Sequence, residues 1–507
     1  MRAVIFTRSA LLMMLNGIGD WSFVVLRRWW QRHKGDRRAA RLRRASLDHA
    51  HARRESPLGH QHQVEPCTLA DELHAREPSL LAAIHTGCSA SIVAVHRARE
   101  VVTSRRNVEP TAAPWQRPTL KSTLVSKPAL SGAAVAYVQD VLCSGWWGYG
   151  PVAQHLQATI ESLYEGRQNA LATSSCTAAM HLALRAAGVG PGDEVIVPAF
   201  TYVSTAVGAI YCGAEPVFAD IDPATLTLSA QTVAPLLSER TRAIIPMHYA
   251  GPPADFEPIR ELVAGRNITV IEDAAHAFGS IRDGKRVGAG AEFSAFSFAP
   301  TKQIASSNGG ILLYRDGERR TEINQLASLG LAADAYHRMI ARGRCPDSHI
   351  ARIGLPSASP PQLAMRIGYR YKLEDLAASL ICASLERLDE IVAHRAALVE
   401  RYYHQLEGVD ELELMPRSTN AAISWYIMPI RVPVDKRDRL RAELATQDID
   451  TAVHYPNLRE QPAFRRCRGD VPVTARESRR VISLPLHHGI QPGEVDRICD
   501  TVRAFLR

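Results

Sequence analysis

The chain has 507 residues, of which 46% are hydrophobic and 22% are charged, and both values are typical of a globular protein with two or three domains. Its formal net charge is +8, but eight arginines crowd between residues 27 and 44, so the excess is local and a uniformly basic nucleic-acid-binding surface is not indicated. The nine cysteines form no CxxC pair and no cluster with histidine at metal-ligand spacing. We therefore expect no bound metal and no disulfide framework, and the cysteine usage favours a reducing cytoplasm.

Residues 1–119 form a basic segment without sustained periodicity, and we expect a disordered extension that ends in the linker-like PTAAPWQRP. The apolar start is broken by Arg8 and Asp20, and its longest uncharged run is short of the roughly 18 to 20 residues that span a bilayer, so no membrane association is expected. A degenerate signal peptide or an interfacial helix is the alternative interpretation. The segment is either a native arm or the result of an upstream start assignment, and no recognised module indicates that it binds nucleic acid.

From residue 120 onward, helix and strand patterns alternate. Helical periodicity covers residues 133–142 and the stretch that follows Thr177. Short apolar runs predict strands at residues 194–198, 216–222, 243–248, 268–273, 293–298 and 310–314. Such strands, separated by helices, predict for residues 120–370 a large α/β domain with a mostly parallel sheet sandwiched by helices. Residues 371–507 are predicted to form a long helix at 374–406 and a smaller α+β domain that ends in a helix at 491–506.

Two ionisable residues follow predicted strands, at the carboxyl ends where ligands of such sheets bind. Asp273 closes ITVIED, and Lys302 comes shortly after FSAFSF. The helix start TSSCTAAMHLAL offers N–H groups and a positive dipole end that suit a phosphate. Taken singly, these features also fit a surface lysine, a capping aspartate and an ordinary N-cap. Together, an amine, a carboxylate and a phosphate cradle fit pyridoxal phosphate (PLP), whose aldehyde, ring nitrogen and phosphate need them.

Ordered motifs across residues 120–507 strengthen this interpretation. They include NALATSSCTAAMHLAL, IEDAAHAFGS, FSFAPTK followed by GG, IGYRYKLEDLAASL, VHYP and ISLPLHHG. In order and spacing they resemble the DegT/DnrJ/EryC1/StrS aminotransferases. The resemblance implies a fold-type-I enzyme with PLP as cofactor, which aminates keto sugars that are usually nucleotide-linked.

The resemblance also implies roles for single residues. Lys302 matches the lysine that forms the Schiff base with PLP and then moves the proton. Asp273 matches the carboxylate that pairs with the pyridinium nitrogen. His276, three residues later and on the same face if a helix begins there, is expected to hydrogen-bond the cofactor or the substrate. A structural histidine is the alternative for His276.

Four further residues match cofactor-binding positions of the family. Cys176 and Thr177 match the phosphate-binding turn, where the backbone N–H groups matter more than the thiol. Ser297 matches a serine that contacts the phosphate. Tyr202 matches the position whose aromatic ring stacks on the cofactor, with a core or surface tyrosine as the alternative.

Three positions depart from the family pattern. Arg370 stands where the family usually has an asparagine that reaches the phosphate of the neighbouring subunit's cofactor, and an arginine can donate to the same group. The resemblance therefore implies a homodimer with shared active sites. Ala299 and Asn308 stand where relatives often have a histidine and an acid, which indicates a difference on the substrate side.

We predict a transaminase that moves an amino group from glutamate or glutamine to a keto sugar. Trp146, Trp147, His454 and Tyr455 are candidate walls of the acceptor site. The family implies work in surface polysaccharide or natural-product biosynthesis. The alternatives are the same fold acting on a cyclitol or another non-sugar ketone, and a non-catalytic PLP-binding regulator with a basic N-terminal arm.

Overall fold

The computed structural model describes residues 123–507, apart from residue 130 and residues 335–336, 338–362 and 418–419. The predicted extension over residues 1–119 lies outside the described residues. The boundary between residues 370 and 371 stays a prediction.

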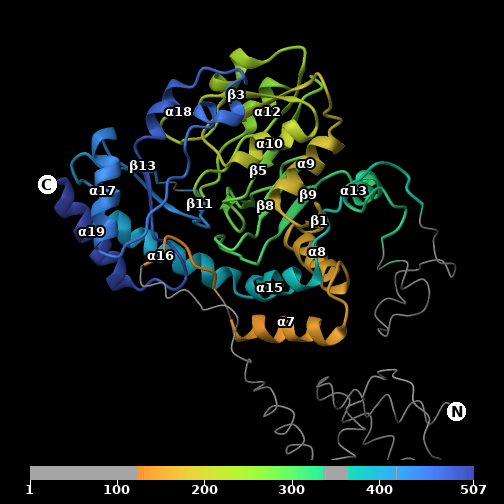
Figure 1. Cartoon of the computed structure of the whole chain (residues 1–507), viewed down its shortest axis with the longest axis horizontal. Coiled ribbons are helices and arrows are strands. Elements are labelled where there is room, and N and C mark those ends of the chain that lie inside the picture. Colours follow the sequence, from red (N-terminus) through yellow and green to blue (C-terminus); the bar gives the residue numbers. More distant parts are fainter. Residues whose placement is uncertain (1–122, 130, 335–336, 338–362, 418–419) are drawn as a thin grey trace, which may run out of the picture. The chain divides into compact units, whose positions relative to one another are not determined.

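A seven-stranded sheet forms the centre of the described part (Figure 1). Five of its strands coincide closely with apolar runs predicted to be buried on both faces. In spatial order the strands are β1 (Asn169–Thr173), β9 (Gly310–Tyr314), β8 (Phe293–Ser297), β5 (Thr269–Asp273), β4 (Thr241–Ile244), β2 (Glu194–Pro198) and β3 (Glu215–Ala219). Among these seven strands, β9 alone runs in the direction opposite to the other six, which confirms the mostly parallel sheet.

The reversed direction of β9 fixes where the loop before it lies. Antiparallel neighbours need no crossover helix, so residues 298–309 return directly from β8 to β9. The N–H of Phe298 donates to the carbonyl of Gly309 at 2.9 Å and closes this loop at its base. The loop that contains Lys302 therefore stays at the carboxyl edge of the parallel strands.

Helices cover both faces of the sheet. Leu171 and Leu312 pack into a cluster with α9 (Cys176–Ala186), α10 (Val203–Tyr211) and α13 (Arg320–Ala327). Their strand neighbours Ala172 and Ile311 point the other way and pack with α8 (Pro151–Leu163) and α15 (Asp375–Leu385), and α7 (Gly132–Ser144) lies against α15. This alternation, expected for a strand, confirms the predicted layering of helix, sheet and helix.

The helix predicted at residues 374–406 is divided into two, α15 and α16 (Leu388–Leu406). At Arg387 the backbone has φ −112° and ψ 16°, outside the helical range. Apolar residues of α15 pack beneath the large sheet, whereas Leu398 and Tyr402 of α16 pack into the C-terminal core. Because of the break at Arg387, the apolar residues of this segment pack into both cores.

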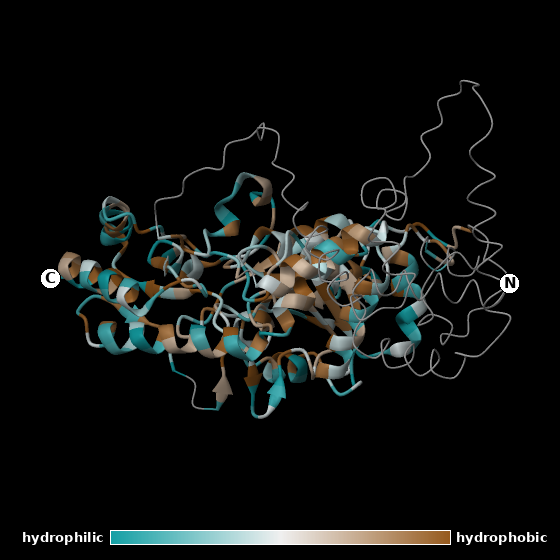
Figure 2. Ribbon diagram, turned by 90° about the horizontal axis from the view of Figure 1, so that it is seen from below, coloured by the Kyte–Doolittle hydropathy of each residue, from teal (hydrophilic) through white to brown (hydrophobic). Residues whose placement is uncertain are grey.

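The C-terminal part is a three-stranded antiparallel sheet of β10 (Glu413–Leu414), β12 (Met428–Arg431) and β13 (Val481–Leu484), packed with α16, α17 (Val434–Thr446) and α19 (Pro492–Leu506). Figure 2 shows the hydrophilic outward faces of these helices. The remaining elements are α11 (Ala230–Val233), η2 (Ala234–Leu236), α12 (Glu257–Leu262), β6 (Ile281–Arg282), β7 (Lys285–Arg286), η3 (Gly317–Arg319), β11 (Ala421–Ala422), η5 (Leu458–Glu460), η6 (Pro462–Phe464) and α18 (Pro472–Glu477). No helix in the described ranges combines the length and apolarity needed to cross a bilayer.

Arg395 of α16 is buried in the C-terminal core. Its Nη1 donates to the carbonyl oxygens of Trp425, Tyr426 and Leu486 at 3.1–3.2 Å. Burial lowers the pKa of Arg395 to about 10, so the guanidinium is still charged at neutral pH. Arg395 thus ties α16 to the backbone segments before β12 and after β13.

Replacing Arg395 with methionine should lower the free energy of unfolding by about 2 to 3 kcal/mol, because three buried carbonyl oxygens lose a charged donor. Chemical denaturation followed by circular dichroism measures the change. Arg466→Met removes an exposed arginine and should alter the same quantity by less than about 0.5 kcal/mol. Equal stabilities of the two variants would contradict this account of Arg395.

Candidate active site

The carboxyl edge of the sheet brings most of the predicted site residues together. Each group follows the end of a different strand, and β1, β2, β5 and β8 all end at this edge. After β1 come Cys176 and Thr177, after β2 Tyr202, after β5 Asp273 and His276, and after β8 Ser297 and Lys302. This shared edge is the region where α/β sheets bind their ligands.

Asp273 is buried at the end of β5, and its carboxylate is held by two donors. The hydroxyl of Thr205 donates to Oδ2 at 2.7 Å, and the N–H of Ala275 donates to Oδ1 at 3.1 Å. Burial raises the pKa of Asp273, while these hydrogen bonds and the positive charge of Lys302 act in the opposite direction. A cation next to this carboxylate would stabilise its ionised form.

Lys302 is only 8% exposed, although lysine is rarely buried without a partner. Its Nζ lies 3.7 Å from the ring centroid of Tyr426, and within the part of the chain that the structure describes it has no carboxylate partner. The other buried lysine near this edge, Lys372, is ion-paired, with Nζ 2.8 Å from Oδ2 of Asp334. The amine of Lys302 is therefore the one available for a ligand.

The turn between β1 and α9 has the form of a phosphate cradle. The Ser175 side chain caps the helix by accepting from the N–H of Ala178 at 3.1 Å, and the first N–H groups of the helix have no intrahelical partner. Burial raises the pKa of the Cys176 thiol, so the thiol is neutral and the backbone carries the positive end of the helix. Thr177 is half-buried beside it.

His276 lies in a turn, because no helix begins after Asp273; the predicted condition for its helical alignment is not met. Its Nδ1 accepts from the N–H of Ala250 at 3.2 Å, and Nε2 lies 2.7 Å from the hydroxyl oxygen of Tyr455. Burial lowers the pKa of His276 well below its usual range. The ring is thus neutral and donates through Nε2 to Tyr455.

Tyr202 precedes α10 and is 57% exposed, with its ring centroid 6.0 Å from that of Tyr455. Its ring is therefore open to a planar ligand. Ser297 is half-buried at the end of β8, where its hydroxyl accepts from the N–H of Ala299 at 3.4 Å. Arg370 is exposed, and its neighbour Tyr371 accepts from the N–H of Ser174 at 2.7 Å, which places residue 370 beside the start of α9.

Sequence reasoning missed two residues that complete this edge. Thr205 binds the carboxylate of Asp273 from the first turn of α10, and its signal was the hydroxyl-rich FTYVSTA. Tyr426, which lies under the Lys302 amine, comes from the segment before β12 and has no local motif. Of the candidate acceptor walls, Tyr455 is buried beside His276, whereas Trp147 is exposed.

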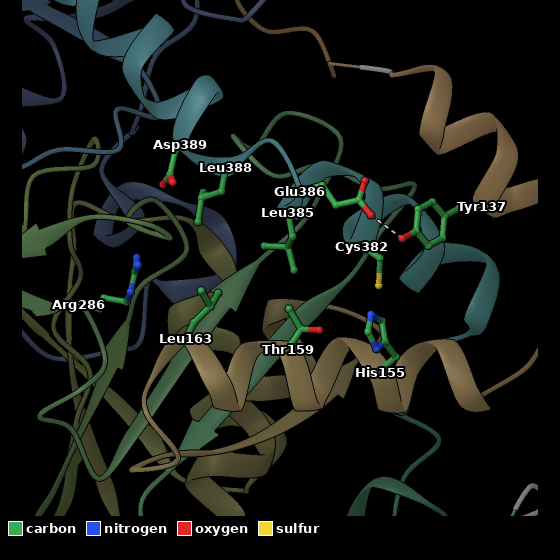
Figure 3. A pocket seen from close by; sticks show the side chains of 10 residues that line it. All are labelled: Tyr137, His155, Thr159, Leu163, Arg286, Cys382, Leu385, Glu386, Leu388 and Asp389. Atoms are coloured by element: carbon green, nitrogen blue, oxygen red, sulfur yellow. Dashed lines mark hydrogen bonds between the residues drawn. The ribbon is translucent and has the colours of Figure 1, made fainter. Parts of the chain in front are cut away.

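A separate cavity of about 240 Å³ lies away from these residues (Figure 3). It is lined by α7, α8, β7 and the junction of α15 and α16, and the hydroxyl of Tyr137 donates to Glu386 at 2.5 Å there. None of the predicted site residues lines it. The described residues contain no group of three or more His, Cys, Asp or Glu side chains that could hold a metal ion.

Solved structures with this fold define the class of the protein. The aminotransferase TlmJ from Streptoalloteichus hindustanus is 31% identical over 75% of this chain and 98% of its own, with a TM-score of 0.67. The putative sugar aminotransferase Spr1654 from Streptococcus pneumoniae, in its PMP (pyridoxamine phosphate) form, is 28% identical over 75% and 98% of the two chains, with a TM-score of 0.68, and a PLP form is also known. A 3-amino-5-hydroxybenzoic acid (AHBA) synthase is 26% identical over 76% and 98%, with a TM-score of 0.66.

The protein is accordingly a PLP-dependent aminotransferase of fold type I. Residues 128–503 match the DegT/DnrJ/EryC1/StrS aminotransferase family, and the chain belongs to that family. The residues at the carboxyl edge fit this cofactor, because a buried amine with no acidic partner among the described residues, a buried carboxylate and an open helix N-terminus lie along one edge.

Gly310 should be essential for the phosphate cradle. A Cβ at this position would lie 2.6 Å from the backbone nitrogen of Cys176, so Gly310→Ala must displace the start of α9. We expect PLP affinity to fall by roughly tenfold or more, the equivalent of losing one charge-assisted hydrogen bond. Gly190→Ala is the matched control, since a Cβ there meets nothing within 4 Å. Equal PLP affinities in fluorescence titrations of the two variants would refute this role.

Proposed function

We propose that the protein transfers an amino group from glutamate or glutamine to a nucleotide-linked keto sugar, with Lys302 as its catalytic base and acid. The observation that carries this proposal is that a buried Lys302, which has no acidic partner within the described ranges, follows β8, while a buried Asp273 ends the neighbouring strand β5. When bound, PLP supplies an aldehyde that bonds to a lysine amine and a ring that stabilises negative charge on the neighbouring carbon.

The chain's own groups divide the remaining tasks. The carboxylate of Asp273 holds positive charge at the ring nitrogen, because a buried anion favours a cation beside it. The N–H groups of Cys176 and Thr177 and the hydroxyl of Ser297 bind the phosphate. The exposed ring of Tyr202 covers one face of the ligand. Lys302 carries the proton between donor, cofactor and acceptor carbon atoms.

His276 acts from the inner wall of the site. Its Nδ1 is taken by the N–H of Ala250, and its Nε2 hydrogen by the hydroxyl of Tyr455. A neutral imidazole with both nitrogens in hydrogen bonds is suited to fixing the position of Tyr455 and to contacting the ligand. It is not suited to proton transfer.

The acceptor class rests on the relatives. Spr1654 is described as a putative sugar aminotransferase, which supports a sugar acceptor. The AHBA synthase is named for a product that is an aminated aromatic acid, and this similarity favours a non-sugar ketone as the second candidate. The ratio of kcat/KM for a nucleotide-linked keto sugar to that for an unlinked cyclic ketone separates the two.

The enzyme is proposed to act as a homodimer with shared sites. An exposed apolar surface is formed by Tyr211, Leu329, Met365 and Ile367, the last of which is 89% exposed. Leu329 and Tyr211 are connected, since the N–H of Leu329 donates to the carbonyl of Tyr369, and the rings of Tyr369 and Tyr211 both contact His181. The N–H of Met365 donates to the carbonyl of Gly330, the residue after Leu329. Arg370 is exposed and forms an antiparallel bridge with Ser328, the neighbour of Leu329, so a second copy that covers Leu329 would meet the guanidinium.

Replacing Lys302 with alanine should leave PLP bound non-covalently and reduce amination of the keto sugar by roughly 100- to 10,000-fold, the usual worth of a positioned acid–base group. Borohydride reduction and peptide mapping of the wild-type protein should place the cofactor on Lys302. Attachment to Lys372 instead, or normal turnover by Lys302→Ala, would overturn the proposal.

Arg370 can be assigned to its own site or to the partner's by mixing two inactive variants. If Arg370 serves the neighbouring subunit, dimers of Lys302→Ala with Arg370→Ala contain one intact site, and random mixing should restore about a quarter of wild-type activity. The activity is measured after co-refolding or co-expression. No recovery, with dimers present by light scattering, would place Arg370 in its own chain's site.

A further inference from the structure

Tyr426 contacts the Lys302 amine, and no sequence motif had indicated this contact. The ring is buried, and the amine nitrogen lies 3.7 Å from its centroid, over its face. A lysine ammonium over an aromatic face is attracted by the negative face of the ring, most strongly where water is excluded. The Tyr426 ring is therefore a binding site for a cation, and Lys302 occupies it.

The Tyr426 ring is held in place from several sides. Its backbone N–H donates to the carbonyl of Ala250 at 2.9 Å, and its own carbonyl accepts from Arg395 at 3.2 Å. Its hydroxyl lies 3.2 Å from the hydroxyl of Thr301, in the same loop as Lys302. The His276 ring packs on it with centroids 4.1 Å apart. A ring fixed in this way does not have to reorganise to receive the ammonium.

We propose that Tyr426 holds the free Lys302 ammonium and thereby stabilises the forms of the enzyme in which Lys302 is not bonded to the cofactor. This inference rests on the proposed role of Lys302. If PLP is bound, the Lys302 ammonium must first give one proton to water. The neutral amine would then form a carbon–nitrogen double bond with the aldehyde carbon, and the aldehyde oxygen would leave as water with the two remaining hydrogens of the nitrogen. The ammonium, and its contact with the Tyr426 ring, are lost in that step.

The contact between Tyr426 and Lys302 should therefore affect the binding of the two cofactor forms differently. Lys302 is free in the empty protein and also in the complex with pyridoxamine phosphate, which has no carbonyl. It is consumed only in the complex with PLP. The Tyr426 ring favours the first two states, so it weakens PLP binding, leaves pyridoxamine phosphate binding unchanged, and shifts the half-reaction toward the aminated cofactor.

The test measures the dissociation constants of both cofactor forms by fluorescence titration of the empty protein. Tyr426→Leu should lower the PLP constant relative to the pyridoxamine phosphate constant by roughly 2- to 30-fold, the factor equivalent to one cation–π contact. Tyr426→Phe keeps the ring face and should keep the wild-type ratio. A general loss of site structure would weaken both forms together and leave the ratio unchanged, which would refute the proposal.

A double-variant comparison isolates the amine. In a Lys302→Ala background, Tyr426→Leu should change the two constants by the same factor, because no ammonium remains. A ratio that shifts equally with and without Lys302 would show that Tyr426 acts on the cofactor directly, and would overturn the inference. If the wild-type protein instead binds PLP no more tightly than Lys302→Ala does, the proposed role of Lys302 fails first.

Discussion

Burying a carboxylate is costly unless hydrogen bonds or an opposite charge offset the loss of water, and this constraint organises the carboxyl edge of the sheet. Asp273 receives one hydroxyl and one N–H, yet burial still raises its pKa. Lys302 lies in the loop after the neighbouring strand β8 and forms no ion pair with Asp273. The two groups thus follow neighbouring strands without pairing with each other, an arrangement that suits a ligand bearing both a cationic ring nitrogen and a carbonyl carbon.

Both the large sheet and the C-terminal part contribute residues to this edge. The strands position Asp273 and Lys302, whereas the aromatic surroundings, Tyr426 and Tyr455, come from residues near the C-terminal sheet. Arg395 connects the two parts, because its guanidinium fixes the carbonyl of the residue whose ring lies under Lys302. The buried guanidinium of Arg395 in the C-terminal core therefore helps to fix the ring that contacts the Lys302 amine.

Short sequence patterns were sufficient to predict the strand ends and the helix start at the carboxyl edge of the sheet. Asp273 and Lys302 follow continuous apolar strands, and a strand end is readable from a few residues. The turn before α9 was equally legible, because small and hydroxyl residues precede a helical period. Motif resemblance then connected these separate signals to one cofactor.

What escaped prediction depends on contacts between distant segments. Nothing near Tyr426 indicates that it meets Lys302, and the hydroxyl-rich FTYVSTA does not by itself show that Thr205 binds Asp273. The break at Arg387 was missed because the apolar pattern continues across it, and only the presence of two cores requires the change of direction. The helix that would have aligned His276 with Asp273 does not form. His276 lies in a turn, and its two ring nitrogens contact other segments, at Ala250 and Tyr455.

The reversed strand β9 has a consequence for how this protein can change over time. Loops that lead into crossover helices tolerate added or lost residues, since the helix can slide along the sheet. The Lys302 loop has no such freedom: it leaves β8 and re-enters at its hydrogen-bonded neighbour β9, and Phe298 and Gly309 fasten it at its base. Insertions or deletions there would move the amine directly. Divergence in substrate choice is therefore expected through replacement of single side chains, such as Ala299 and Asn308, at constant loop length.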